Sequence, residues 1–138
     1  MRLEGKVAFI SGGARGMGAA EAMLFASEGA KVAIGDILET EAQQVEAEIS
    51  ELGGEAVFIH LDVTSETNWQ HAISATVTRF GKLDILVNNA GISGTFDPDL
   101  MSTEAWDKLM DVNAKSAFLG VKTAIPEMRK VGGGSIIN

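Results

Sequence analysis

The sequence predicts an α/β fold in which helices cover both faces of a doubly wound parallel sheet, giving three layers. Two observations carry this prediction. Short, continuous apolar segments alternate strictly with longer segments that have a helical repeat, and the connections between them are short. Continuous apolar segments are typical of parallel strands that are buried on both faces. Because crossovers are right-handed, the alternation favours the strand order 3-2-1-4-5.

Glycines mark where the elements of the first part of the chain end. Gly29, Gly53 and Gly81 each follow a segment with helical character, as expected of helix C-terminal caps. Between these stops the apolar segments are four to six residues long, which suits strands. The expected strands are 6–11, 31–35, 56–61 and 83–87, and the expected helices are 16–27, 39–52 and 65–80.

The second part of the chain predicts a loop, a long helix and a fifth strand. Residues 92–101 read as the loop, and Ser102 or Thr103 can cap the helix that follows. An apolar stripe from Trp106 to Met128 defines that helix, and Pro126 should kink or loosen its last turn. The fifth strand begins at 135–138, and an open apolar edge there is an aggregation liability. We therefore expect residues 1–138 to be one incomplete domain of a longer chain.

Composition excludes several classes of function. The chain has 138 residues, is 46% hydrophobic and carries a net charge of −8 without a lysine or arginine cluster, so nucleic acid and anionic membranes are poor partners. With no cysteine and two histidines, neither a thiolate nor a His-rich metal site is expected. No apolar run approaches the ~20 residues of a membrane span. A soluble cytoplasmic protein is the expectation.

A glycine cluster follows the first expected strand and opens the first expected helix. Gly12, Gly16 and Gly18 form G-x-x-x-G-x-G. Glycine lets the main chain turn tightly and lets a pyrophosphate approach the N-terminus of a helix, whose free N–H groups attract anions. The alternative is a merely flexible turn, but the position in the first strand–helix turn favours a nucleotide site. A P-loop is disfavoured because no Lys-Ser or Lys-Thr pair follows the last glycine.

Asp36 closes the second expected strand and bears on the choice of nucleotide. A carboxylate there can accept hydrogen bonds from both ribose hydroxyls of an adenosine. It would repel a 2′-phosphate, which carries roughly −1.5 to −2 charges by analogy with a phosphoryl side chain. Arg15 could instead help hold a 2′-phosphate, but Asp36 is better placed, so NAD is favoured over NADP. The alternative is that Asp36 caps the helix near Glu39.

Polar residues also follow the third and fourth expected strands. Asp62 comes after the third strand, and N-N-A-G at 88–91 comes after the fourth. Ligands of open α/β sheets bind at these carboxyl ends, and the small residues Ala90 and Gly91 would permit close approach of a cofactor. Each motif alone reads as an ordinary turn. Their joint placement favours a binding site.

Asn113 is a polar residue on an otherwise apolar helical stripe. It lies four residues after Leu109 and four before Ala117, so the periodicity predicts that it is buried. A buried amide needs hydrogen-bond partners. From the residues alone, a bond that packs one helix against another is the simpler interpretation, and Trp106 on the same stripe is most simply a core residue.

Taken together, the motifs resemble the short-chain dehydrogenase/reductase family. They are S-G-G-A-R-G-M-G, Asp36, D-V at 62–63, N-N-A-G, Asn113 and the closing G-S-I-I-N, in order and at family spacing. The closest likeness is to NAD-using secondary-alcohol dehydrogenases of Rossmann-type fold. One small departure is Ser11, where the family usually has threonine. The resemblance implies a pyrophosphate turn at Gly12, Gly16, Met17 and Gly18, a ribose contact at Asp36, adenine contacts at Asp62 and Val63, cofactor contacts at Asn89, Ala90 and Gly91, and the catalytic-tetrad asparagine at Asn113.

The chain contains no tyrosine, which limits what the resemblance implies. Family chemistry interconverts a secondary alcohol and a ketone by hydride transfer, with a tyrosine as general acid and base. The family's catalytic serine, tyrosine and lysine would follow G-S-I-I-N. The resemblance therefore implies the cofactor half of an enzyme that is usually a homotetramer, with one tetrad residue that helps to hold a water in a proton relay. The alternative is a short, non-catalytic NAD-binding or interaction module. An extended-type epimerase or dehydratase usually has G-x-x-G-x-x-G, which this spacing does not match.

Overall fold

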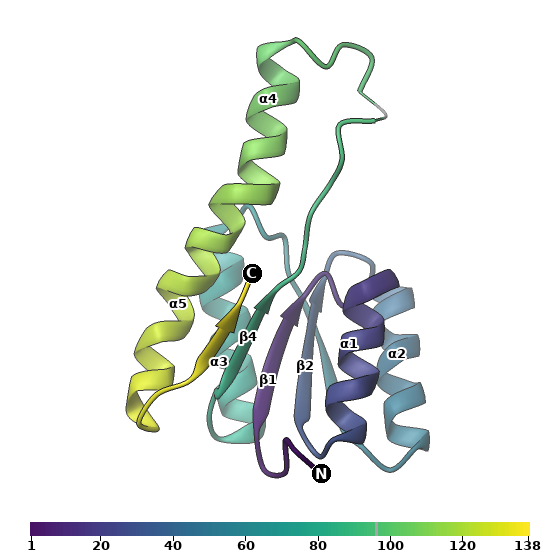
Figure 1. Cartoon of the computed structure of the whole chain (residues 1–138), viewed down its shortest axis with the longest axis vertical. Helices are drawn as coiled ribbons and strands as arrows, with labels where there is room; N and C mark the ends of the chain where they lie inside the picture. Colours follow the sequence, from purple (N-terminus) through teal and green to yellow (C-terminus); the bar gives the residue numbers. More distant parts are fainter. Residues whose placement is uncertain (96) are drawn as a thin grey trace.

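A five-stranded parallel sheet forms the centre of the molecule (Figure 1). The computed structural model describes residues 1–95 and 97–138, so position 96 of the predicted loop lies outside the described residues. The sheet order is β3-β2-β1-β4-β5, which confirms the predicted fold class and strand order. The strands are β1 (Val7–Ser11), β2 (Lys31–Asp36), β3 (Glu55–His60), β4 (Ile85–Asn88) and β5 (Ser135–Ile137).

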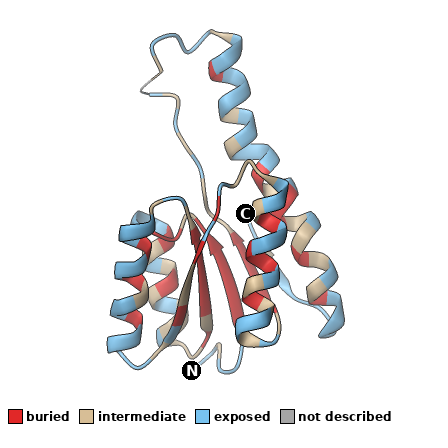
Figure 2. Cartoon of the chain, turned by 180° about the vertical axis from the view of Figure 1, so that it is seen from behind, coloured by how far each residue is buried: buried red, intermediate tan, exposed pale blue. Residues whose placement is uncertain are grey.

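Helices cover both faces of the sheet. One face packs against α1 (Gly16–Ser27) and α2 (Glu39–Glu51), and the other packs against α3 (Glu66–Phe80) and α5 (Ser116–Lys130). Figure 2 shows the buried residues gathered on the strands and on the helix sides that face them. None of the helices described here combines the length and the apolar character needed to cross a lipid bilayer.

Strand β1 shows why the apolar segments form the middle of the sheet. All its residues are buried. Ile10 belongs to the core beneath α1 and α2, whereas Phe9 points to the opposite face and meets Trp69 of α3, with ring centroids 5.7 Å apart. Successive side chains of a strand point to opposite faces of the sheet. Only a strand whose apolar residues run continuously can therefore contribute to the cores on both faces.

The helix ends follow the predicted stop and start signals. The Ser65 hydroxyl accepts a hydrogen bond from the Asn68 N–H at the start of α3, and the Ser102 hydroxyl does the same for Ala105 at the start of α4 (Thr103–Met110). Gly81 ends α3 with a φ of 89°, a left-handed conformation that favours glycine.

The long helix predicted after Ser102 is interrupted. Between α4 and α5 lies one π-helical turn, η1 (Asp111–Lys115). The expected core position of Trp106 is wrong, because its side chain is 63% exposed. The reason is visible in Figure 1, where α4 extends beyond the carboxyl ends of the strands. The helix continues past Pro126 to Lys130, and Met128 of its last turn packs into the core.

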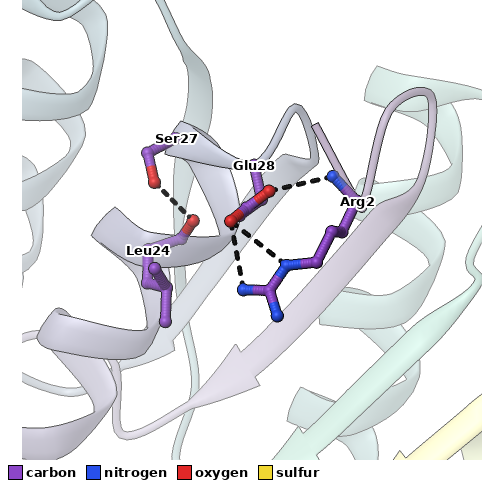
Figure 3. Close-up of polar contacts among 4 residues, drawn as sticks. All are labelled: Arg2, Leu24, Ser27 and Glu28. Carbon is purple, nitrogen blue, oxygen red and sulfur yellow. Dashed lines mark hydrogen bonds and ion pairs between the residues drawn. The ribbon is translucent and has the colours of Figure 1, made fainter.

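Charged residues stabilise the sheet edge opposite to the carboxyl ends of the strands. Asp84, which precedes β4 and is nearly buried, accepts a 2.8 Å hydrogen bond from the Val7 N–H and pairs with Lys82 at 2.9 Å. At the N-terminus the Glu28 carboxylate accepts three hydrogen bonds from Arg2, at 2.9, 3.0 and 3.2 Å (Figure 3). These bonds lower the pKa of Glu28. They tie the start of the chain to the end of α1.

Candidate functional site

A cleft of about 440 Å³ lies at the carboxyl ends of β1, β2, β3 and β4. This is the edge where open α/β sheets bind ligands. Most residues that the sequence suggested as cofactor contacts line it: Gly12, Arg15, Gly16, Asp36, Asp62, Val63, Asn89, Ala90 and Gly91. The lining described for this cleft does not include Met17, Gly18 or Asn113.

Two of the three motif glycines, Gly12 and Gly18, pack so tightly that a side chain would be excluded there. A Cβ atom on Gly12, whose φ is +69°, would lie 2.8 Å from the Ala90 Cα. One on Gly18, which is buried, would lie 2.2 Å from the Gly12 carbonyl oxygen. Gly16 differs, because its φ of +58° favours glycine while the space beside it is open. Gly12 and Gly16, which line the cleft, thus present main chain without a side chain there.

The N-terminus of α1 opens onto this turn. Within the described residues, the side chain of Arg15, the N-cap position, makes no capping hydrogen bond, and no acidic residue occupies the first turn. The first N–H groups of a helix have no partner within it, and the helix dipole makes this end positive. The cleft therefore has a site suited to an anion such as a phosphate.

The Asp36 carboxylate is fixed beside the turn by main-chain donors. Its Oδ2 accepts a 3.0 Å hydrogen bond from the Ala14 N–H, and its Oδ1 accepts one of 3.0 Å from the Leu38 N–H. The alternative that Asp36 is the N-cap of α2 is wrong, because Leu38 holds that position. Each carboxylate oxygen retains a further lone pair, so Asp36 can still accept hydrogen bonds from hydroxyl groups in the cleft.

Asp62 organises the turn between β3 and α3. Its Oδ1 accepts hydrogen bonds from the Thr64 hydroxyl at 2.7 Å and from the Thr64 N–H at 2.9 Å, which lower the pKa of this carboxyl. The bonds that Asp62 Oδ1 accepts are therefore those of an ordinary turn. The residue also lines the cleft, together with Val63.

Asn89 joins the end of β4 to the glycine turn. Its Nδ2 donates hydrogen bonds to the carbonyl oxygens of Ser11 and Gly12, at 3.1 and 3.0 Å. The Ser11 hydroxyl accepts from the N–H groups of Asn89 and Ala90, each at 3.2 Å. A serine at position 11 thus provides the hydroxyl that these bonds require, and the Asn89 amide acts on the main chain of the turn.

Asn113 lies in the π turn, and the expectation that it is buried is wrong. The residue is exposed, because a wider turn shifts the apolar stripe out of phase at a point beyond the sheet. Its Oδ1 accepts a 2.8 Å hydrogen bond from the Ile92 N–H, and its Nδ2 donates one of 2.8 Å to the Ile92 carbonyl. The amide therefore holds the segment after β4, and it does not pack helix against helix.

Sequence reasoning missed several lining residues. Some carried a usable signal, since Thr64 lies two residues after Asp62, as in an Asx turn, and Ile92 directly follows N-N-A-G. Ile37 and Leu38 simply continue from Asp36. Leu61 directly precedes Asp62 and Val112 directly precedes Asn113, so these two also adjoin residues that the motifs had indicated.

Comparison with known proteins places these features in a family context. The family model described as short chain dehydrogenase matches residues 6–138. The 2,5-dichloro-2,5-cyclohexadiene-1,4-diol dehydrogenase LinX of Sphingobium indicum is 55% identical over 99% of this chain and 55% of its own length. The 3-alpha-(or 20-beta)-hydroxysteroid dehydrogenase of Mycobacterium tuberculosis is 48% identical over 99% of this chain and 52% of its own length. The chain thus spans about half the length of the curated relatives it matches.

Solved structures share the same fold. The crystal structure of a metagenomic short-chain oxidoreductase in complex with NADP superposes with a TM-score of 0.91. Its sequence is 35% identical, and the match covers 100% of this chain and 63% of the other.

Proposed function

This chain belongs to the short-chain dehydrogenase family, and from that premise we propose that it is the NAD-binding part of an oxidoreductase that interconverts a secondary alcohol and a ketone. One observation supports this more than any other. The glycine turn, where Gly12 and Gly18 leave no room for side chains, lies at the free N-terminus of α1, and the Asp36 carboxylate is held beside it by the Ala14 N–H. This combination fits a dinucleotide, which needs an anion site next to a ribose acceptor.

Each part of the cleft has a proposed role toward the dinucleotide. Gly12, Gly16, Met17 and Gly18 form the turn that receives the pyrophosphate, with Arg15 beside it. Asp36 holds the adenosine ribose. The adenine and the remainder of the cofactor lie along residues that follow β3 and β4: Asp62, Val63, Asn89, Ala90 and Gly91.

We propose NAD rather than NADP because of the charge at Asp36. A 2′-phosphate would meet an anion whose two oxygens already face main-chain donors of the protein. Two like charges about 4 Å apart near a protein surface repel by about 4 kcal/mol at an effective dielectric constant of ~20. The related structure that holds NADP makes this preference a question for experiment.

The hydride chemistry belongs to the cofactor when it is bound. The chain's own contribution is to bind and orient the dinucleotide and to position Asn113, the proposed tetrad asparagine. One N–H of its amide is bonded to the Ile92 carbonyl, and the second can hold a water for proton transfer. Because residues 1–138 contain no tyrosine, we expect them to bind NAD without turning over alcohol by themselves.

The substrate class we propose is an alicyclic secondary alcohol or its ketone. Two relatives that match nearly the whole chain are named for dehydrogenation of a cyclohexadiene diol and of a hydroxysteroid.

The net charge of −8 is in keeping with a protein that has neither nucleic acid nor a membrane as partner. We further propose that the parent protein is cytoplasmic and homo-oligomeric.

Activity of the whole parent protein tests this function. With an alicyclic secondary alcohol we expect turnover with NAD and much slower turnover with NADP. Asp36→Ala should lower the ratio of kcat/KM with NAD to kcat/KM with NADP at least about tenfold, equivalent to ~1.4 kcal/mol. Glu51→Ala, which removes an exposed charge at the end of α2, is the control and should leave the ratio unchanged. An unchanged ratio in the Asp36 variant would contradict the proposed preference for NAD over NADP.

A second candidate, compatible with a cleft lined by residues 12–112 alone, is a non-catalytic NAD-binding or interaction module. The intact mass of the native polypeptide separates the two. A monodisperse species of 14.5 kDa that binds NAD but oxidises no alcohol would favour the module. A mass of about twice that value would favour the dehydrogenase, because this chain covers 55% of the length of the LinX dehydrogenase.

A further inference from the structure

Residues 89–92, which we call the 89–92 segment, connect the two asparagines of the site. The segment follows β4 and has neither helical nor strand structure of its own. It lines the cleft along its whole length. Side chains from two distant parts of the chain define its main-chain position.

The glycine turn holds the first end of the segment. The Ser11 hydroxyl accepts hydrogen bonds from two consecutive N–H groups, those of Asn89 and Ala90. The Asn89 side chain donates back to the Ser11 and Gly12 carbonyls. A Cβ on Gly12 would come within 2.8 Å of the Ala90 Cα, so the two main chains are in direct contact. A shift of the turn therefore displaces the first end of the segment.

The π turn holds the second end. Asn113 uses both polar atoms of its amide on Ile92, one on the N–H and one on the carbonyl, each at 2.8 Å. Between the two ends lies Gly91, where a Cβ would come within 3.3 Å of the Asn113 Oδ1. The second end is thus bonded to a helix that is remote from the glycine turn in sequence.

We propose that the 89–92 segment couples the glycine turn to Asn113, so that Asn89 and Asn113 act together as positioning residues. The segment spans only four residues, each of which extends the chain by at most ~3.6 Å, so its two bonded ends lie close together. Loss of the hydrogen bonds at either end of the segment frees that end and loosens the other. The consequence for dinucleotide affinity rests on the proposed function, whereas the coupling itself does not.

Hydrogen exchange without any cofactor tests the coupling directly. Asn113→Ala removes an exposed side chain and leaves the acceptor of the Ala90 amide, the Ser11 hydroxyl, in place. We expect the Ala90 amide nevertheless to exchange about fivefold faster, as for the loss of roughly one net hydrogen bond. Gln70→Ala on the exposed face of α3 is the control and should change neither amide. Faster exchange confined to Ile92 would overturn the proposal.

The reverse experiment uses Asn89. Asn89→Ala should accelerate exchange at the Ile92 amide, which Asn89 does not contact and whose own partner, Asn113, is intact. Asn113→Asp keeps an acceptor for the Ile92 N–H but loses the donor to its carbonyl, so its effect on Ala90 should be smaller than that of Asn113→Ala. Equal effects of the two Asn113 variants on exchange at Ala90, or an unchanged exchange rate of the Ile92 amide in Asn89→Ala, would contradict the coupling.

A double-mutant cycle on NADH affinity tests the functional consequence. Each single variant, Asn89→Ala and Asn113→Ala, should weaken NADH binding about fivefold, and the double variant should lose much less than the product of the two. Independent losses that multiply would refute the coupling even though NADH binds. Failure of the wild-type protein to bind NADH would instead refute the proposed function, and the exchange experiments would still decide the coupling.

Discussion

Gly18→Ala is the substitution whose effect follows most directly from the packing of the glycine turn. The added Cβ would lie 2.2 Å from the Gly12 carbonyl oxygen, 2.6 Å from the Asn89 Nδ2 and 2.9 Å from the Gly12 carbonyl carbon. Since Cβ contacts under 3.0 Å are essentially never seen, the closest atom must move by at least 3.0 − 2.2 = 0.8 Å. That atom is main chain, and it accepts the Asn89 hydrogen bond.

The cost of this displacement can be set against the gain in helix propensity. Overpacking of this kind costs typically ~1–3 kcal/mol, and we expect the upper part of that range because main chain must shift. Alanine within a helix recovers up to ~1 kcal/mol relative to glycine. The net destabilisation should therefore be about 2 kcal/mol. NADH affinity should fall at least about tenfold, because the displaced turn is the proposed pyrophosphate site.

Gly53→Ala provides a matched control for loss of stability alone. Gly53 has a φ of +84°, open space around it and a position after α2, remote from the cleft. Alanine there should cost ~1–2 kcal/mol from left-handed strain without moving any atom of the turn. Urea denaturation gives the stability of both variants, and fluorescence titration gives their NADH affinities. If Gly18→Ala bound NADH as tightly as Gly53→Ala does, the steric reasoning would be refuted.

Three further predictions concern stability. Asp84→Ala should cost ~2–3 kcal/mol in urea denaturation, because it leaves the Val7 N–H buried without its acceptor; a loss under ~0.5 kcal/mol would contradict this. Glu21 has a carboxylate oxygen that finds no partner among the described residues, and burial raises its pKa, so its charge opposes folding at neutral pH. Glu21→Gln should therefore raise Tm at pH 7, with the difference vanishing well below pH 4.5; equal Tm values at pH 7 would count against it. Hydrogen bonds from Thr64 lower the pKa of Asp62, so their contribution is present above its ordinary value of 3.8 and disappears as the pH falls through the lowered one. The Tm deficit of Thr64→Val should accordingly shrink on acidification, and a deficit independent of pH would disprove the link.

The sheet and the location of the cleft could be predicted because they depend on local patterns. Continuous apolar runs such as β1 fit a sheet covered on both faces, and right-handed crossovers then favour the strand order that the structure has. Since parallel strands end at one edge, residues that follow different strands, such as Asp36 and Asp62, are brought into one cleft. Neither step requires knowledge of contacts between side chains.

Asn113 and Trp106 show where periodicity fails. A repeat of 3.6 residues assumes one uninterrupted α-helix with a neighbour along its whole length. The π turn η1 changes the phase, and α4 extends beyond the strands, so that both residues are exposed. The sequence around Asn113 carried no sign of the π turn.

Asn89 and Gly18 show the limit of motif reasoning. The N-N-A-G and glycine motifs indicated which edge of the sheet these residues occupy. They did not indicate that the Asn89 amide bonds to the turn, nor that Gly18 packs directly against the Gly12 carbonyl. Those roles depend on packing between segments that are far apart in the sequence, and only the structure contains that information.

The affinities of this chain for NADH and NADPH test the central claim most directly. Both nucleotides are fluorescent, so the same titration of residues 1–138 gives the two dissociation constants under identical conditions. With Asp36 beside the glycine turn, we predict saturable binding of one NADH per chain, at least about tenfold tighter than NADPH, or ~1.4 kcal/mol. Equal or tighter binding of NADPH, or no saturable binding of either nucleotide, would contradict the account.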